Sequence, residues 1–235
     1  IMSSDWSSDV CSSDLYLPDP CYGTYRLGGT DFGCWRSHGR LEAVDAIAYS
    51  CNIFFYQAVQ LGSVDGLGDF ASSMGLGSRL TTVLPGERAG FVPYSDDLDR
   101  MYGSDGWGTG NLLNLSVGQG ELVATPLQVA AVAGEIASAG EMPPVRVTLP
   151  EDSLIPLPDP ASPKLSQPTL SVLERGMRRA VTDPSGTLNG AMGDLPWEFY
   201  GKSGTAEVPG EPHSWVAGYV REPRPVAVAV IVEHG

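Results

Sequence analysis

The feature that most constrains the fold is a trio of extended runs at the C-terminal end of the chain. In the last run, 226–232, valine occupies every second position and alanine or isoleucine the positions between, which is the period-2 pattern of a β-strand. The earlier runs, 197–206 and 214–220, are set off by the breaker clusters Gly-Glu-Pro and Glu-Pro-Arg-Pro, both of hairpin length. This spacing predicts a three-stranded antiparallel meander.

The first of these strands carries an unusual set of side chains. Lys202 supplies a cation, Ser203 and Thr205 supply hydroxyls, and Gly204 has no side chain to block a second backbone that approaches the strand. A peptide can pair with such an edge through main-chain hydrogen bonds. The pattern indicates a site for a peptide carboxylate.

Charge and cysteine usage exclude some functions. The 235 residues carry a net charge of -14, which argues against a nucleic-acid partner because little would neutralise a phosphate backbone. Only two lysines are present, Lys164 and Lys202. All four cysteines lie in the first quarter of the chain, which favours a local metal site or a disulfide. No apolar run reaches the length of a membrane span.

The two ends of the chain look irregular. Residues 1–15 repeat Ser-Ser-Asp three times without apolar periodicity and resemble translated sequencing-adapter sequence. We therefore expect 1–15 to be a disordered or non-native tail and 16–235 to be a partial domain. The chain stops directly after the last predicted strand, and we expect a fragment that is cut at both ends.

Two helices are predicted around the tripeptide Ser50-Cys51-Asn52. The apolar spacing over 41–48 predicts one helix, and the run 53–61 predicts a second with Gly62 as its C-terminal cap. Ser50 or Asn52 would then start the second helix, and the simplest structural explanation for either residue is an N-cap.

The middle of the chain alternates loops and helices. The pattern predicts a short helix over 64–74, mostly loop over 75–106, and a buried strand or turn over 112–120. Thr125 and Gln128 form a capping box around Pro126, which predicts the start of a helix that Gly140 ends.

A proline-rich connection and one more helix complete this region. Residues 141–168 contain eight prolines and predict an extended surface connection. The apolar stripe that follows predicts an amphipathic helix, capped by Thr169 and ending near Asp183.

Three spaced motifs resemble a penicillin-binding protein transpeptidase domain. They are Ser50-Cys51-Asn52, Val117-Gly118-Gln119-Gly120 and Lys202-Ser203-Gly204-Thr205-Ala206, and the likeness covers residues 16–235. Flanking residues are similar to the class B, elongation-type members. The resemblance implies an α+β fold, shared with serine β-lactamases, in which helices flank an antiparallel sheet beside a mostly helical lobe. We expect that fold to be incomplete at both ends.

The reaction implied by the resemblance is acyl transfer. A serine attacks the penultimate D-alanine carbonyl of a peptidoglycan stem peptide, and an amine then resolves the acyl-enzyme into a cross-link. The family's nucleophile and base lie in a Ser-x-x-Lys motif. Ala161 stands three residues before Lys164, and Phe199 three before Lys202, so the motif is absent. We expect it upstream in the full-length protein, and this chain to be inactive alone.

The remaining roles are implied by position in the family motifs. Ser50 resembles the serine that relays a proton toward the leaving amine, and Asn52 the residue whose amide binds the donor peptide. Lys202 would supply positive potential. The hydroxyls of Ser203 and Thr205 would hold the terminal carboxylate or its β-lactam mimic, and the Thr205 N–H would form half of an oxyanion hole.

A second set of residues has metal-ligating chemistry. Asp19, Cys34, His38 and Cys51 form a candidate zinc shell. Some elongation-type members are thought to carry zinc on two aspartates, a histidine and a cysteine, and Cys34 would replace the second aspartate. Zinc would brace the loop of Ser50, but other interpretations remain open: a disulfide from Cys34 to Cys51 or Cys21, or plain buried thiols.

Partners and location follow from the same resemblance. It implies stem peptides, β-lactams and membrane proteins of the elongation complex as partners. It also implies that the full-length protein lies at the periplasmic face of the bacterial inner membrane. Two alternatives are a non-catalytic module that binds penicillins, muropeptides or protein partners, and a serine β-lactamase. Because the upstream helix would be missing, we expect an open cleft and marginal stability.

Overall fold

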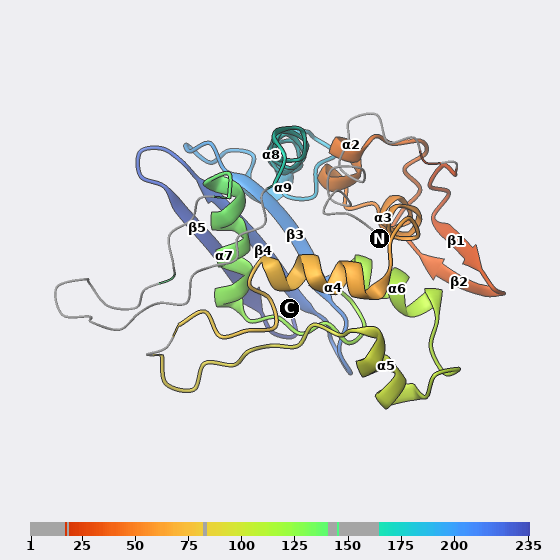
Figure 1. Cartoon of the computed structure of the whole chain (residues 1–235). Helices are drawn as coiled ribbons and strands as arrows, with labels where there is room; N and C mark the ends of the chain where they lie inside the picture. Colours follow the sequence, from red (N-terminus) through yellow and green to blue (C-terminus); the bar gives the residue numbers. More distant parts are fainter. Residues whose placement is uncertain (1–16, 18, 82–83, 141–144, 146–164) are drawn as a thin grey trace.

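The computed structural model describes residues 17, 19–81, 84–140, 145 and 165–235. It confirms an α+β fold in which helices surround a sheet (Figure 1). The helices are α2 (Ala43–Ala48), α3 (Asn52–Val59), α4 (Val64–Ser73), α5 (Ser95–Tyr102), α6 (Thr109–Ser116), α7 (Pro126–Ala137), α8 (Gln167–Thr182) and α9 (Asn189–Met192). The strands are β1 (Thr24–Leu27), β2 (Thr30–Gly33), β3 (Tyr200–Ala206), β4 (His213–Val220) and β5 (Val226–Val232).

The predicted C-terminal meander is confirmed. Strands β3, β4 and β5 lie in that order, and both neighbouring pairs are antiparallel. Lys202 is opposite Ala217, and Val216 is opposite Val230. Since β4 is central, β3 has one edge that no strand covers among the described residues. This edge faces the cleft described below.

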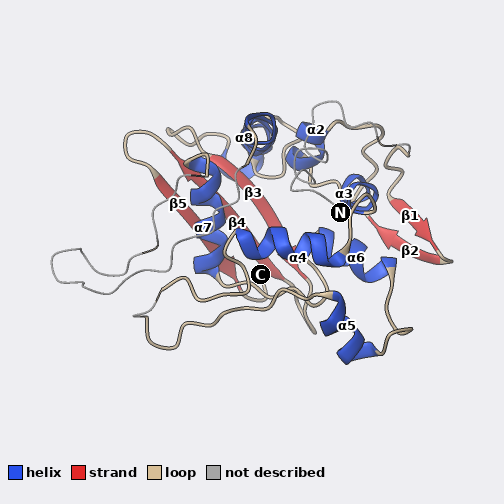
Figure 2. Ribbon diagram, viewed as in Figure 1, coloured by secondary structure: helices blue, strands red, loops and turns tan. Residues whose placement is uncertain are grey.

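Two long helices pack on the sheet (Figure 2). Helix α7 contacts β4 and β5, and helix α8 contacts β3 on one side and α2 on the other. The approach of α8 to α2 depends on Gly176, which is buried at the crossing. A Cβ atom at that position would lie 2.7 Å from the Cβ of Ile47, closer than real side chains approach.

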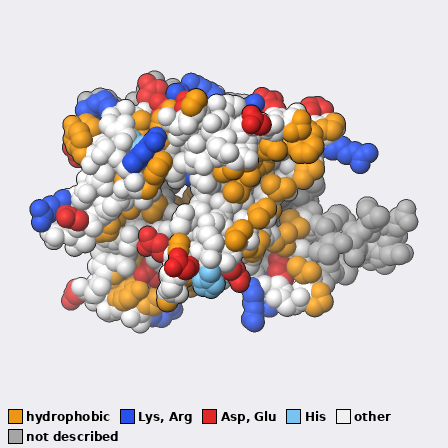
Figure 3. All heavy atoms as spheres, turned by 180° about the vertical axis from the view of Figure 1, so that it is seen from behind, with side chains coloured by type: hydrophobic (Ala, Val, Ile, Leu, Met, Phe, Trp, Pro, Cys, Tyr) orange, Lys and Arg blue, Asp and Glu red, His pale blue; other side chains and the backbone are white. Residues whose placement is uncertain are grey.

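The outer face of β5 remains partly uncovered. Val226, Val230 and Val232 are each about half exposed. From behind, hydrophobic side chains gather on the surface of the molecule (Figure 3). Val228 differs, because it packs against a small core cluster of Val181, Leu188 and Phe199.

A helical lobe lies beside the sheet. Helix α3 is its centre, with six buried residues, and it contacts α2, α6 and the small sheet of β1 and β2. The β1–β2 hairpin turns at Gly28 and Gly29, whose φ angles of 56° and 86° favour glycine. The Gly- and Pro-rich sequence of residues 17–40 predicts only a loop, so the hairpin corrects that prediction.

One further expectation for the middle of the chain is wrong, and a second, mostly loop over 75–106, is right but incomplete. Residues 109–116 form helix α6 rather than a strand or turn, because Leu112, Leu113 and Leu115 are buried in the core that includes α3. The stretch 75–106 also contains helix α5, which begins with a hydrogen bond from the Tyr94 N–H to the Asp97 carboxylate.

Helix ends agree with some predicted caps and correct others. The Thr125 capping box is present, with the Thr125 N–H 2.8 Å from Gln128 Oε1 and the Gln128 N–H 3.2 Å from Thr125 Oγ1. Helix α8 is capped by Ser166, so Thr169 lies inside its first turn. Helix α3 ends at Val59 with Gln60 as its cap, two residues before Gly62.

Some predictions fall outside the described residues. These are the tail at 1–15 and all of the proline-rich connection at 141–168 except 145 and 165–168. Among the described helices, none combines the length and the hydrophobicity needed to span a bilayer.

Candidate active site

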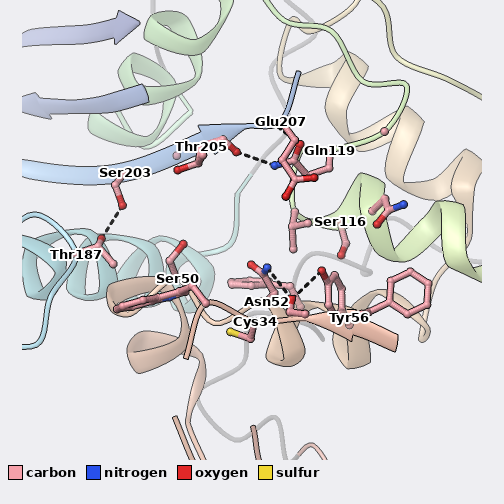
Figure 4. Close-up of a pocket in the computed structure, with 18 of the residues that line it drawn as sticks. Cys34, Ser50, Asn52, Tyr56, Ser116, Gln119, Thr187, Ser203, Thr205 and Glu207 are labelled. Carbon is pink, nitrogen blue, oxygen red and sulfur yellow. Dashed lines mark hydrogen bonds between the residues drawn. The ribbon is translucent and has the colours of Figure 1, made fainter. Parts of the chain in front are cut away.

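A cleft of about 1330 Å³ lies between the free edge of β3 and the helical lobe (Figure 4). Its walls come from segments that are far apart in the sequence: 31–35, 50–56, 114–120 and 202–207, together with Thr187. Six predicted catalytic or peptide-binding residues line it, namely Ser50, Asn52, Lys202, Ser203, Gly204 and Thr205. Cys34 of the predicted metal shell lines it too. The fold thus gathers the catalytic and peptide-binding candidates in one place.

Lys202 joins the two walls of the cleft. Its Nζ lies 2.7 Å from Ser50 Oγ, although the residues are 152 positions apart, and 2.6 Å from the carbonyl oxygen of Ser203. Burial lowers the pKa of Lys202 from 10.5 to about 8. Among the described residues, no carboxylate forms a salt bridge with this ammonium. Its positive charge is therefore available to an anionic ligand.

The tight turn between α2 and α3 presents Ser50 to Lys202. Ser50 has a φ of 54°, in the left-handed region that a residue with a Cβ rarely adopts. The turn is closed by a 2.9 Å hydrogen bond from the Cys51 N–H to the Ala46 carbonyl. Helix α3 is capped by Cys51 without any side-chain bond, so the N-cap interpretation of Ser50 and Asn52 is wrong. Neither polar side chain caps a helix, and both line the cleft.

The hydroxyls of β3 and the amide of Asn52 line the same space. Ser203 Oγ donates a 2.7 Å hydrogen bond to Thr187 Oγ1, and Thr205 is exposed. Asn52 Nδ2 donates to the carbonyl of Gly33 at 3.1 Å, and the Tyr56 hydroxyl donates to the same oxygen at 3.3 Å. Asn52 therefore stands at the mouth of the cleft, on the side of strand β2.

Several polar residues of the cleft were not predicted as site residues, among them Thr187, Gln119 and Glu207. Thr187 lies in the turn after α8, where its N–H bonds to the Ala48 carbonyl at 3.3 Å. Gln119 and Glu207 meet across the cleft, with the Glu207 N–H 3.1 Å from Gln119 Oε1. Gln119 lies in the Gly-Gln-Gly motif, to which the sequence alone assigns no role. The turn Ser185-Gly186-Thr187 is the only sequence signal for Thr187.

A group of thiols and an imidazole adjoins the cleft. The potential ligand atoms of Cys21, Cys34, His38 and Cys51 all lie within 4.8 Å of one another. Nδ1 of His38 is 3.4 Å from the sulfur of Cys21 and 3.5 Å from that of Cys34. A hydrogen bond between the thiols of Cys34 and Cys51 lowers the pKa of Cys34 and raises that of Cys51. Three cysteines and one histidine are a ligand set that zinc takes in tetrahedral sites.

The structure changes one member of the expected metal shell. Cys34, His38 and Cys51 lie together as expected, but Cys21 takes the fourth place. Asp19 is exposed, and its backbone N–H and carbonyl each bond to the Gln57 amide at 2.9 Å. The three cysteines are present as free thiols. Cys21 lies in the group because backbone hydrogen bonds join it to His38 and Gly39.

Comparison with known proteins agrees with this geometry. The family described as Penicillin binding protein transpeptidase domain matches residues 20–235. The Peptidoglycan D,D-transpeptidase MrdA of Haemophilus influenzae is 28% identical over 210 residues, which cover 86% of this chain and 32% of the relative. MrdA of Escherichia coli K12 is 26% identical, over 97% of this chain and 40% of the relative. The chain thus spans about a third to two fifths of the length of these relatives.

Solved structures give the same result. PBP2 from Helicobacter pylori has a TM-score of 0.82 with 26% identity, over 99% of this chain and 45% of that one. PBP2 of Pseudomonas aeruginosa, in complex with WCK 5153, has a TM-score of 0.77 with 25% identity, over 99% of this chain and 53% of that one.

The fold and the residues of the cleft therefore define a peptidoglycan transpeptidase type of domain. The chain belongs to the penicillin-binding protein transpeptidase domain family, and its relatives include PBP2 proteins.

Proposed function

We propose that this chain forms the donor-peptide cradle of a peptidoglycan D,D-transpeptidase that acts in cell elongation. The observation that carries the proposal is the 2.7 Å contact between Lys202 Nζ and Ser50 Oγ. It brings together the two motifs that handle the substrate carboxylate and the proton in this family. The names of the relatives support the reaction, and PBP2 of H. pylori, solved with MreC, supports elongation-complex membrane proteins as partners.

In the proposed binding mode each group has one task. Lys202 and the hydroxyls of Ser203 and Thr205 bind the terminal carboxylate of a D-Ala-D-Ala stem peptide, or the matching carboxylate of a β-lactam. Ser50 Oγ passes a proton between the general base and the leaving amine. The Thr205 N–H stabilises the oxyanion that forms at the attacked carbonyl, and loss of one such donor costs about 3 kcal/mol of barrier. Asn52 orients the donor backbone.

The nucleophile is a separate matter. The 235 residues contain no Ser-x-x-Lys, so the proposal assigns this chain binding of the peptide but no acyl-enzyme of its own. We place the complete protein at the periplasmic face of the inner membrane, where its substrate lies.

Binding and acylation can be tested separately. Acetyl-D-Ala-D-Ala added to the ¹⁵N-labelled chain should shift the amide signals of Ser203 and Thr205, whereas acetyl-L-Ala-L-Ala should not. Lys202→Ala should remove the response and Arg100→Ala on α5 should retain it. An equal response to both peptides would refute the cradle.

Fluorescent penicillin should leave no covalent label on the chain. A covalent adduct that survives denaturation would show that the chain has a nucleophile after all. The absence of Ser-x-x-Lys also favours a second candidate, a non-catalytic module that binds muropeptides. If a full-length reading frame also lacks Ser-x-x-Lys, that candidate replaces the enzyme.

We also propose a structural zinc ion on Cys21, Cys34, His38 and Cys51. The residues fit this ion in donor type and in proximity. A zinc ion there would hold the β1–β2 hairpin to the turn that contains Ser50, because Cys51 follows Ser50 directly. The four residues thus brace the position of Ser50 and Asn52.

Metal analysis of the purified chain should find about one zinc per chain. Cys21→Ser should lower the zinc content, whereas Asp19→Ala should leave it unchanged because Asp19 lies outside the group. Absence of stoichiometric zinc, together with an oxidised pair in a thiol count, would instead support a disulfide.

A further inference from the structure

The cleft carries opposite charges along one wall. Among the described residues that line it, only Asp31, Lys202 and Glu207 are charged. Lys202 lies within β3 and Glu207 directly follows it, so five steps of extended chain separate their Cα atoms by about 17 Å. Figure 4 shows Ser203, Thr205 and Glu207 in this order along the wall. A cation therefore lies toward one end of the wall and an anion toward the other.

The Glu207 carboxylate has no cationic partner in the part of the chain that the structure describes. No arginine, lysine or histidine there forms a salt bridge with it. Asp31 differs, because Arg26 pairs with it at 3.4 Å across the β1–β2 hairpin. Glu207 is also exposed, so an incoming cation has access to it. Its negative charge is available to a ligand, as the positive charge of Lys202 is.

The wall opposite Glu207 suits a cation on an apolar stem. Tyr56 lies there, with its ring centroid 5.8 Å from that of Phe32, and Phe55 lines the cleft with them (Figure 4). Burial is the main cause that raises the pKa of the Tyr56 phenol, and the negative charge of Glu207 adds to it from across the cleft. Aromatic rings attract ammonium groups and cover methylene stems. The two walls thus favour the same kind of side chain.

Hydrogen bonds fix the backbone from which the carboxylate projects. The Glu207 N–H donates to Gln119 Oε1 at 3.1 Å, and Gln119 Nε2 donates to the Thr205 carbonyl at 2.7 Å. The N–H of Gln119 in turn donates to the Asn114 carbonyl at the end of α6, at 3.0 Å. The carboxylate of Glu207 therefore starts from a fixed point, two residues beyond Thr205.

The proposed binding mode brings one side chain of the donor peptide near this carboxylate, and this step rests on the proposed function. The terminal carboxylate of the donor lies at Lys202 and the hydroxyls of Ser203 and Thr205, and the attacked carbonyl lies at the Thr205 N–H. The residue before D-Ala-D-Ala is then the one nearest to Glu207. About 7 Å of extended strand separates Thr205 from Glu207, and the stem of a lysine side chain spans about 6 Å.

We propose that Glu207 is a specificity-determining residue that selects donor peptides with an ammonium group on the residue before D-Ala-D-Ala. The ligand class is a peptide with a diamino acid at that position. Its ammonium pairs with the Glu207 carboxylate while its terminal carboxylate pairs with Lys202. The two ion pairs also fix the direction of the peptide, because a reversed peptide would bring like charges together.

The test compares two peptides that differ by one acetyl group. Nα-acetyl-Lys-D-Ala-D-Ala keeps a free ammonium, and diacetyl-Lys-D-Ala-D-Ala does not. The amide shifts of Ser203, Thr205 and Glu207 in the ¹⁵N-labelled chain give both dissociation constants. At about 0.05 M salt the peptide with the free ammonium should bind about threefold more tightly, the effect of one exposed ion pair. The preference should shrink at about 0.5 M salt, where the charges are screened.

Three variants assign the preference to one carboxylate, and the spectrum reports whether each is folded. Glu207→Gln keeps the size of the side chain without its charge, so it should bind both lysine peptides equally. Asp31→Asn is the matched control: Asp31 lines the same cleft but already pairs with Arg26, so the preference should stay. Glu207→Lys should reverse the selection and favour acetyl-Glu-D-Ala-D-Ala over Nα-acetyl-Lys-D-Ala-D-Ala.

The outcomes distinguish this inference from the function on which it rests. If the wild type binds both lysine peptides equally at Ser203, Glu207 does not select the ligand and the cradle stands. If Glu207→Gln keeps the preference, the ammonium binds elsewhere. If Asp31→Asn also loses it, the general negative potential of the cleft is the cause, and either result overturns the inference. If neither peptide shifts the signals of Ser203 and Thr205 in the folded wild type, the proposed function itself fails.

Discussion

Lys202 shows how one residue can define a binding site. Its ammonium is held by two neutral oxygens, Ser50 Oγ and the Ser203 carbonyl, and burial lowers its pKa to about 8. The neutral partners leave its charge uncompensated, so a carboxylate is the ligand that stabilises it most. The strained turn at Ser50 serves this contact, because it directs the hydroxyl across the cleft.

Ligand binding should depend on pH through Lys202. Below about pH 8 the free site is protonated and attracts a carboxylate; above it the site loses its charge, so affinity for acetyl-D-Ala-D-Ala should fall as pH rises. Titrations from about pH 6 to about pH 10 would measure this. Lys202→Arg keeps a cation over this range and should bind with little pH dependence. A flat profile for the wild type would contradict the assignment of Lys202 to the carboxylate.

At the scale of elements, the crossing of α8 over α2 positions β3 beside the turn of Ser50. Gly176 is buried there, and an added Cβ would come within 2.7 Å of the Ile47 Cβ. Gly176→Ala should therefore lower the free energy of unfolding by about 1–3 kcal/mol through overpacking, as measured in urea. Gly190→Ala in α9 is the matched control: nothing lies within 4 Å of its added Cβ, so stability should stay equal or rise slightly. If Gly176→Ala is as stable as the Gly190→Ala control, the crossing tolerates a methyl group and the prediction is wrong.

Elements with local signals could be predicted from the sequence. The valine alternation of β5 and the Thr125 capping box act within a few residues, and both are confirmed. Helix α6 was missed because its leucines become a helix face only against the core around α3. The β1–β2 hairpin was missed because its turn and short strands resemble a loop.

The candidate site divides in the same way. Ser50 and Lys202 came from motifs that resemble a family, since nothing local relates residues 152 positions apart. Thr187 was not predicted, and neither were the contacts of Gln119 and Cys21, because tertiary packing alone brings these residues to their places. The motifs predict the type of chemistry at the site, whereas tertiary packing determines which other residues line it.

For the whole molecule, two surface properties oppose each other. The net charge of -14 repels one copy from another. The uncovered face of β5, with Val226, Val230 and Val232 exposed, offers an apolar strand that pairs only with β4 among the described residues. Exposed apolar edge strands template association between chains. Salt screens the repulsion over a Debye length of about 10 Å at 0.1 M and leaves the apolar contact intact.

The chain should therefore self-associate more strongly as salt is added. Sedimentation velocity from about 0.05 M to about 0.5 M salt should show a shift from monomer to larger species in the wild type. Val230→Lys places a charge on the exposed face and should keep the chain monomeric without changing its melting temperature. Val228→Lys is the contrast on the same strand: it puts an ammonium among Leu188 and Phe199, so it should lower the melting temperature instead. If Val230→Lys associates as the wild type does, the contact between chains lies elsewhere on the surface and β5 does not drive the association.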